Sequence, residues 1–105
     1  LDKDLSGNAQ IMGEYFKAKL SELPHVTDAR GRGLFIGCEY DIPIALEVKW
    51  ACFRRRLLIT AIGDNINRMI PPLLLAKEHI DQAVEIIKDS INEAAAKHEE
   101  QQKTA

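Results

Sequence analysis

The sequence has few cysteines, few aromatic residues and no long apolar segment. Its two cysteines, Cys38 and Cys52, form no CxxC pair, and the histidines His25, His79 and His98 are scattered, so no metal-ligand spacing is present. Aromatic residues make up only 6% of the chain. We therefore expect two buried free thiols and no metal site.

The chain also lacks a large excess of positive or of negative charge. The net charge is −2 over 105 residues, which offers no electrostatic basis for binding nucleic acid or an anionic membrane. No apolar run has the length of a membrane span, and no signal-peptide pattern opens the chain. With 46% apolar and 29% charged residues, the composition is typical of one folded domain, which we expect in the cytoplasm. The chain starts at Leu1 rather than methionine, which suggests a fragment, a processed product or a trimmed chain.

The hydrophobic pattern predicts alternating helices and hairpins. Helical spacing places Met12, Tyr15, Phe16, Leu20 and Leu23 on one face, and does the same for Ile80, Val84, Ile87 and Ile91. The expected elements are a helix over 8–23, strands over 26–30 and 34–40, a helix over 44–56, strands over 57–62 and 66–70, and a helix over 77–95. This order predicts an α+β two-layer sandwich, with a small, mostly antiparallel sheet of three or four strands and helices packed on one face.

Most of the residues that could bind a ligand or take part in catalysis are better explained by structural roles. Gly31-Arg32-Gly33 lacks phosphate-loop spacing and precedes no helix, so it indicates a turn. The basic run over 54–56 suits a helix C-terminus, and Trp50 indicates a core or interface anchor. Nothing in the spacing of the carboxylates Asp28, Glu39 and Asp41 forces two of them together, so no acid–base pair is evident. The residues themselves therefore predict no catalytic, cofactor-binding or metal-binding group.

Arg68 is the exception. It ends a short apolar run and precedes Pro71-Pro72, which lack backbone N–H groups and end the strand. A guanidinium is always charged and carries paired donors, which suit a substrate carboxylate. Two interpretations stay open: Arg68 binds a ligand at a rigid strand exit, or it is an edge-strand charge that faces water.

Three ordered segments, over 26–39, over 57–73 and in the helix from Lys77, together resemble class III aminotransferases, the fold-type I enzymes that depend on pyridoxal phosphate. Val26 to Glu39 resembles the family's "V-x-x-x-R-G-x-G-L-x-x-G-x-E" segment. Leu57-Leu58 and then Asn65 to Leu73 resemble "G-L-L … N-x-x-R-x-x-P-P-L", and the helix from Lys77 resembles "E-x-I-D-x-A". The resemblance runs from about residue 8 to residue 92 and is strongest to acetylornithine and succinylornithine aminotransferases, with ornithine and 4-aminobutyrate aminotransferases close behind.

The resemblance implies that residues 1–96 form the small C-terminal domain of a longer, homodimeric enzyme in arginine biosynthesis. The segment 97–105 is polar and without periodicity, so we expect a frayed tail there. Such an enzyme transfers the amino group of an N-acylated ornithine-type donor to 2-oxoglutarate, and Arg68 matches the arginine that binds the substrate's α-carboxylate. The Schiff-base lysine and the other pyridoxal-phosphate-binding groups belong to a large domain, so the chain alone is expected to be inactive. The sequence leaves the amino donor undetermined.

One position departs from the family pattern. Arg56 stands where the family has a glycine, at a helix C-terminal position that needs a left-handed backbone. We therefore expect the helix to run on or to end differently.

Two other functions stay open from the sequence. The chain can be a free-standing module that binds an amino acid, or a structural interaction domain without catalysis. An isolated domain would expose the surface that packs on the large domain. We therefore expect self-association or marginal stability of the isolated chain.

Overall fold

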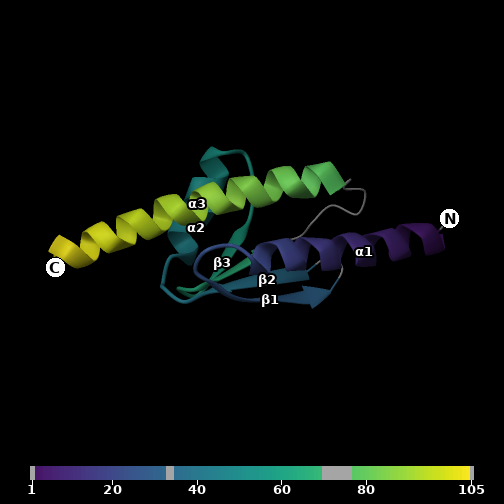
Figure 1. Cartoon of the computed structure of the whole chain (residues 1–105), viewed down its shortest axis with the longest axis horizontal. Helices are drawn as coiled ribbons and strands as arrows, with labels where there is room; N and C mark the ends of the chain where they lie inside the picture. Colours follow the sequence, from purple (N-terminus) through teal and green to yellow (C-terminus); the bar gives the residue numbers. More distant parts are fainter. Residues whose placement is uncertain (1, 33–34, 70–76, 105) are drawn as a thin grey trace.

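The computed structural model describes residues 2–32, 35–69 and 77–104 and shows two layers (Figure 1). In chain order the elements are α1 (Asp2–Ser21), β1 (Val26–Arg32), β2 (Phe35–Tyr40), α2 (Ala45–Arg54), β3 (Thr60–Ile62), β4 (Ile66–Met69) and α3 (Lys77–Thr104). The strands form an antiparallel sheet in the order β1-β2-β4-β3. All three helices lie on one face of this sheet, so the predicted α+β two-layer fold is confirmed.

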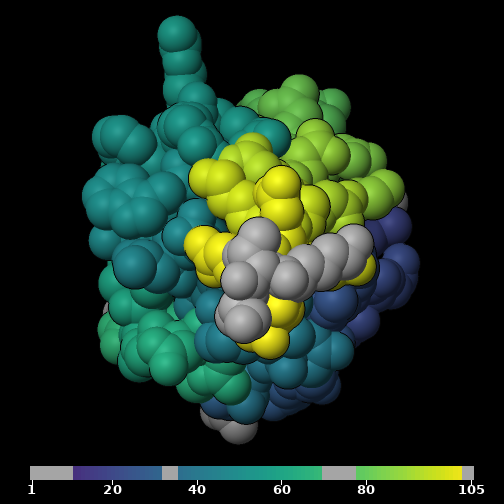
Figure 2. Space-filling view, turned by 90° about the vertical axis from the view of Figure 1, so that its left-hand side faces the viewer, coloured from purple at the N-terminus to yellow at the C-terminus, as the bar shows by residue number. Residues whose placement is uncertain are grey.

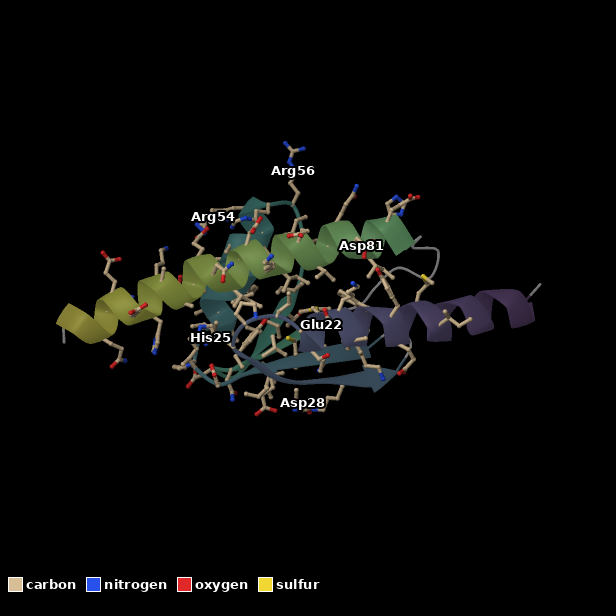
Figure 3. All side chains as sticks on the ribbon, in the orientation of Figure 1. Glu22, His25, Asp28, Arg54, Arg56 and Asp81 are labelled. Carbon is tan, nitrogen blue, oxygen red and sulfur yellow. The ribbon has the colours of Figure 1, made fainter. Side chains whose placement is uncertain are left out.

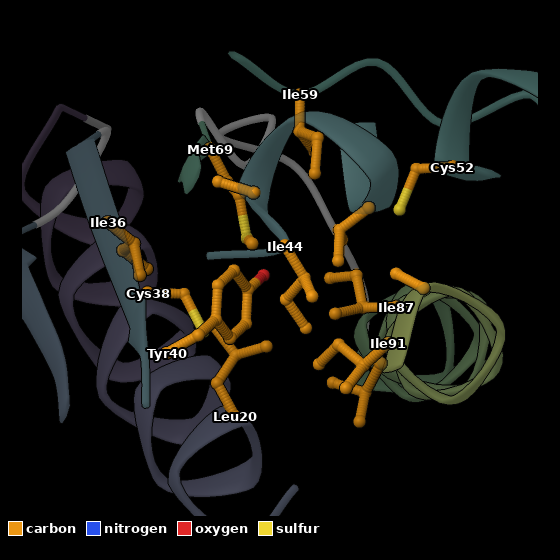
Figure 4. Close-up of a cluster of buried hydrophobic side chains, with 14 of the residues drawn as sticks. Leu20, Ile36, Cys38, Tyr40, Ile44, Cys52, Ile59, Met69, Ile87 and Ile91 are labelled. Atoms are coloured by element: carbon orange, nitrogen blue, oxygen red, sulfur yellow. The ribbon is translucent and has the colours of Figure 1, made fainter. Parts of the chain in front are cut away.

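The core lies between the sheet and the helices (Figure 4). The predicted stripe of α3 is buried, since Ile80, Ile87 and Ile91 are at most 1% exposed. Leu20 of the neighbouring helix α1 and Tyr40 of the sheet strand β2 belong to the same buried cluster. Figure 2 shows the C-terminal part of α3, in yellow, between the teal α2 side and the blue-purple α1 side of the molecule. Because both neighbouring helices contact α3, it holds the helical layer together.

Helix α2 ends with a left-handed residue, against our expectation. Arg56 has φ 68°, and the N–H groups of Leu57 and Arg56 donate to the carbonyls of Cys52 and Phe53. These two bonds form the Schellman motif, which normally has glycine at this position. The expectation that arginine makes the helix end differently is therefore wrong. Because Leu57 is held by the helix end, β3 begins at Thr60 rather than at Leu57.

Other element ends also differ from the sequence pattern. Strand β1 continues through Gly31 and Arg32, where we expected a turn, and α3 continues to Thr104 rather than ending near Ala95. The expected Pro71-Pro72 exit lies outside the described residues. None of the helices in the described parts of the chain is long and apolar enough to cross a membrane.

Helix α2 turns its largest apolar side chains away from the core. Leu46, Trp50 and Phe53 are 53%, 49% and 55% exposed, and the rings of Trp50 and Phe53 meet edge to face. The smaller residues Val48 and Cys52 are buried instead. The expectation that Trp50 anchors the core is therefore wrong, while an interface role for it stays untested.

Candidate functional site

The face of the sheet opposite the helices carries a row of cross-strand neighbours. Gly37 of β2 lies opposite Arg30 of β1 on one side and opposite Arg68 of β4 on the other, and Arg68 lies opposite Thr60 of β3. Directly opposed residues of an antiparallel sheet project to the same face. Asp28, two residues before Arg30, projects from the sheet away from the helices (Figure 3). Arg30 and Arg68 therefore share the face opposite the helices, with only a glycine between them.

Arg68 has an exposed side chain and, among the described residues, no side-chain hydrogen bond or ion pair. It lines a shallow groove of about 470 Å³ together with Arg30, Gly31, Gly37, Ile62 and Ile66. Strand β4 is an inner strand, so the edge-strand interpretation of Arg68 is wrong, although the side chain does face solvent. The arrangement leaves the paired donors of Arg68 available to an anionic group.

Arg30, by contrast, pairs with two carboxylates through one of its guanidinium nitrogens. Its Nη1 lies 2.7 Å from a carboxylate oxygen of Asp28 and 2.8 Å from one of Glu39. These hydrogen bonds, the one to Glu39 first, raise the pKa of the Arg30 guanidinium. The sheet register places Asp28 directly opposite Glu39, so it brings together two carboxylates that the sequence spacing left apart. They act as an ion-pair clamp on Arg30 rather than as an acid–base pair.

A buried polar cluster holds the strand of Arg68 from behind. Asn67 is 0% exposed and faces the helices. Its side-chain oxygen accepts a 2.5 Å hydrogen bond from the Tyr40 hydroxyl, and its Nδ2 donates to the carbonyls of Ala45 at 3.0 Å and Thr60 at 3.3 Å. Burial raises the pKa of the Tyr40 hydroxyl, which therefore stays a proton donor. This cluster ties β4 to β2, β3 and α2, and so fixes the backbone from which Arg68 projects.

The other candidates have structural partners. Arg54 and Arg55 of the basic run both pair with Glu93 of α3, and His25 pairs with Asp41 at 3.0 Å. Both cysteines are buried and free, as predicted. Within the described residues, no group of three or more His, Cys, Asp or Glu side chains could hold a metal ion.

Sequence reasoning missed Gly37 and Asn67 as parts of this site. Gly37 belongs to the strand pattern, and nothing in its spacing shows that it separates two arginines. For Asn67, alternation was the available signal, because it shares a face with the buried Met69.

Comparison with known proteins identifies the family of the chain. A family model described as aminotransferase class III matches residues 1–91. The chain belongs to the class III aminotransferases. The chain is 36% identical over 85 residues to the acetylornithine aminotransferase of Caldanaerobacter subterraneus, and 40% identical over 90 residues to the ornithine aminotransferase of Staphylococcus epidermidis. These alignments cover 77% and 84% of the chain, but only 22% of each relative.

Solved structures of aminotransferases share the fold of this chain. The acetylornithine aminotransferase of Elizabethkingia anophelis superposes with a TM-score of 0.74 at 28% identity, covering 88% of this chain and 26% of that one. The ornithine aminotransferase of Plasmodium yoelii superposes with a TM-score of 0.75 at 26% identity, covering 89% and 26%. The aminotransferase chain thus spans about a quarter of the length of these relatives.

Class III aminotransferases depend on pyridoxal phosphate, which is held through a lysine amine. No lysine lines the described part of the Arg68 groove. Lys17 reaches the Gly31 carbonyl at 2.8 Å, but it belongs to α1, on the other side of the sheet, and pairs with Glu14. The described residues therefore do not by themselves fit a cofactor site.

Proposed function

We propose that this chain is the small C-terminal domain of a pyridoxal-phosphate-dependent aminotransferase and supplies the arginine that binds the substrate's α-carboxylate. The observation that supports this proposal is Arg68, whose exposed guanidinium has no partner among the described residues and lies in a groove next to a glycine. An N-acylated ornithine-type compound is the amino donor in this proposal, and 2-oxoglutarate is the acceptor.

Arg68 suits both substrates, because each carries a carboxylate beside the reacting carbon. Two parallel N–H donors fix a carboxylate in one plane and orient the rest of the molecule. Gly37 contributes no side chain next to the guanidinium, so a ligand can approach it, while Ile62 and Ile66 give the groove apolar walls. The chain's own part in the reaction is to bind and orient the substrate.

The remaining parts of the proposal follow from the family. A large domain would supply the cofactor, its lysine and the side-chain specificity pocket, and the complete enzyme would be a cytoplasmic homodimer. The domain would comprise residues 1–96, and the helix α3 would continue beyond it to Thr104. The isolated chain would not transaminate.

The test is substitution of Arg68 by lysine and by alanine in the full-length enzyme. Loss of a charge-assisted contact to a desolvated carboxylate costs about 2–4 kcal/mol, so kcat/KM for both substrates should fall by about 30- to 1000-fold. Arg56→Ala is the matched control, because it removes an exposed arginine at the end of α2 (Figure 3) and should leave kcat/KM unchanged. A decrease of less than about threefold for Arg68→Ala would refute the proposed role.

The alternatives from the sequence have their own test. A free-standing amino-acid-binding module should bind an ornithine derivative or 2-oxoglutarate tightly without a partner, as calorimetric titration of the isolated chain would measure. The open groove provides a single unpaired charged anchor among the described residues, which favours the domain over the module.

A further inference from the structure

Glu39 is placed by register to pair with either of two arginines. It lies on β2, between β1 and β4, and two residues before it Gly37 faces both Arg30 and Arg68. Glu39 is therefore the diagonal neighbour of both arginines, a separation that long side chains span. The structure shows its carboxylate on Arg30, at 2.8 Å, and not on Arg68.

Asp28 explains why removal of Arg30 would release Glu39. Asp28 and Glu39 are directly opposed, and Arg30 neutralises both carboxylates at once. Like charges directly opposite each other on neighbouring strands destabilise a sheet. Without Arg30, repulsion from Asp28 would move the Glu39 carboxylate toward the remaining cation on its other side, which is Arg68.

We infer that Arg30 is a positioning residue, which holds Glu39 and thereby keeps Arg68 available for the substrate carboxylate. This inference rests on the proposed function of Arg68. A carboxylate attached to the same sheet would compete with substrate at the high effective concentration of an intramolecular ligand. Arg30 prevents that competition without touching the substrate itself.

The kinetic test uses Arg30→Met in the full-length enzyme, with and without Glu39→Gln. In Arg30→Met, an exposed ion pair between Glu39 and Arg68 would compete with the substrate carboxylate. A pair of this kind is strong enough to raise KM for the carboxylate substrates about two- to fivefold, with kcat nearly unchanged. Adding Glu39→Gln should restore KM, because glutamine carries no charge to compete for Arg68. The matched control is Asp28→Asn in the Arg30→Met background. It should restore KM only in part, because it removes the repulsion from Asp28 but leaves the Glu39 charge that competes for Arg68.

Salt provides a second readout. The competing pair is exposed, so about 1 M salt should screen it and reduce the KM difference between Arg30→Met and wild type. A merely structural role for Arg30 predicts instead that Glu39→Gln fails to rescue the variant. Thermal melting of each variant confirms that it is folded at the assay temperature.

The isolated chain offers a direct test that needs no activity. The Nε–Hε signal of Arg68, identified by its loss in Arg68→Lys, is followed by NMR while 2-oxoglutarate is added. In Arg30→Met this signal should shift before any ligand is added, and the response to 2-oxoglutarate should weaken about two- to fivefold. Both changes should disappear when Glu39→Gln is added.

The two arms separate the inference from the function on which it rests. If the Arg68 signal responds to Glu39 in Arg30→Met but Arg68→Ala leaves kcat/KM intact, the proposed function fails and the ion-pair exchange stands. If Arg68→Ala abolishes activity but Arg30→Met leaves KM and the Arg68 signal unchanged, the inference about Arg30 is overturned.

Discussion

Arg56 has a left-handed backbone conformation that is costly for any residue with a side chain. It occupies the left-handed position of the α2 C-terminus with φ 68°, and its side chain makes no hydrogen bond or ion pair within the described part of the chain. A left-handed conformation costs a non-glycine residue about 1–2 kcal/mol, a cost that glycine avoids. Arg56→Gly should therefore stabilise the protein.

The size of the gain is limited by the unfolded state. Glycine makes the unfolded chain freer, which offsets about 0.4–1 kcal/mol of the relief. The net stabilisation should be about 0.5–1 kcal/mol, equivalent to a rise in Tm of about 2–6 °C for a domain of this size. Urea unfolding and thermal melting followed by circular dichroism measure the two quantities.

Arg56→Ala is the control, because it removes the same side chain but keeps the left-handed cost. It should melt within about 1 °C of wild type, since an exposed side chain without partners contributes little. The reasoning is refuted if Arg56→Gly is no more stable than Arg56→Ala.

Two further predictions concern buried groups. Tyr40→Phe removes the donor to the buried Asn67 side chain and should cost about 1–3 kcal/mol in urea unfolding. Tyr15→Phe, which loses an exposed 2.5 Å bond to Asp81, should cost less, and equal losses would contradict the buried-cluster argument. Burial raises the pKa of the Cys38 thiol from 9.0 to about 12, so the unfolded chain loses this proton at lower pH than the folded one. The free energy of unfolding should therefore fall as pH rises from 9 to about 12, and Cys38→Ala should reduce that slope; an identical slope would show that Cys38 ionises alike in both states.

The layers of this fold could be predicted from the sequence because α1 and α3 each carry a regular apolar stripe. Ile80, Ile87 and Ile91 recur at helical spacing and are buried as the pattern predicts. Helix α2 was harder, because its larger apolar residues, including Trp50, face solvent and its small ones face the core. Periodicity identifies a face, but burial depends on how much room the neighbouring elements leave.

The site could be predicted only in part. Arg68 stands out by its chemistry, but its relation to Arg30 and Glu39 depends on strand register. Register couples residues about thirty positions apart, such as Gly37 and Arg68, and no local pattern encodes that pairing. For the same reason the pairing of Asp28 with Glu39 was not evident from their spacing.

The strand order has a consequence for how the protein folds. Each hairpin closes locally, but the two hairpins meet only where β2 pairs with β4, across a loop that contains all of α2. Closing such a loop costs chain entropy before its contacts form, so this seam belongs to the slow part of folding. Gly37 and Arg68 become neighbours at that seam. The groove that Arg68 lines therefore does not exist in either hairpin alone and is assembled only when the two halves of the sheet join.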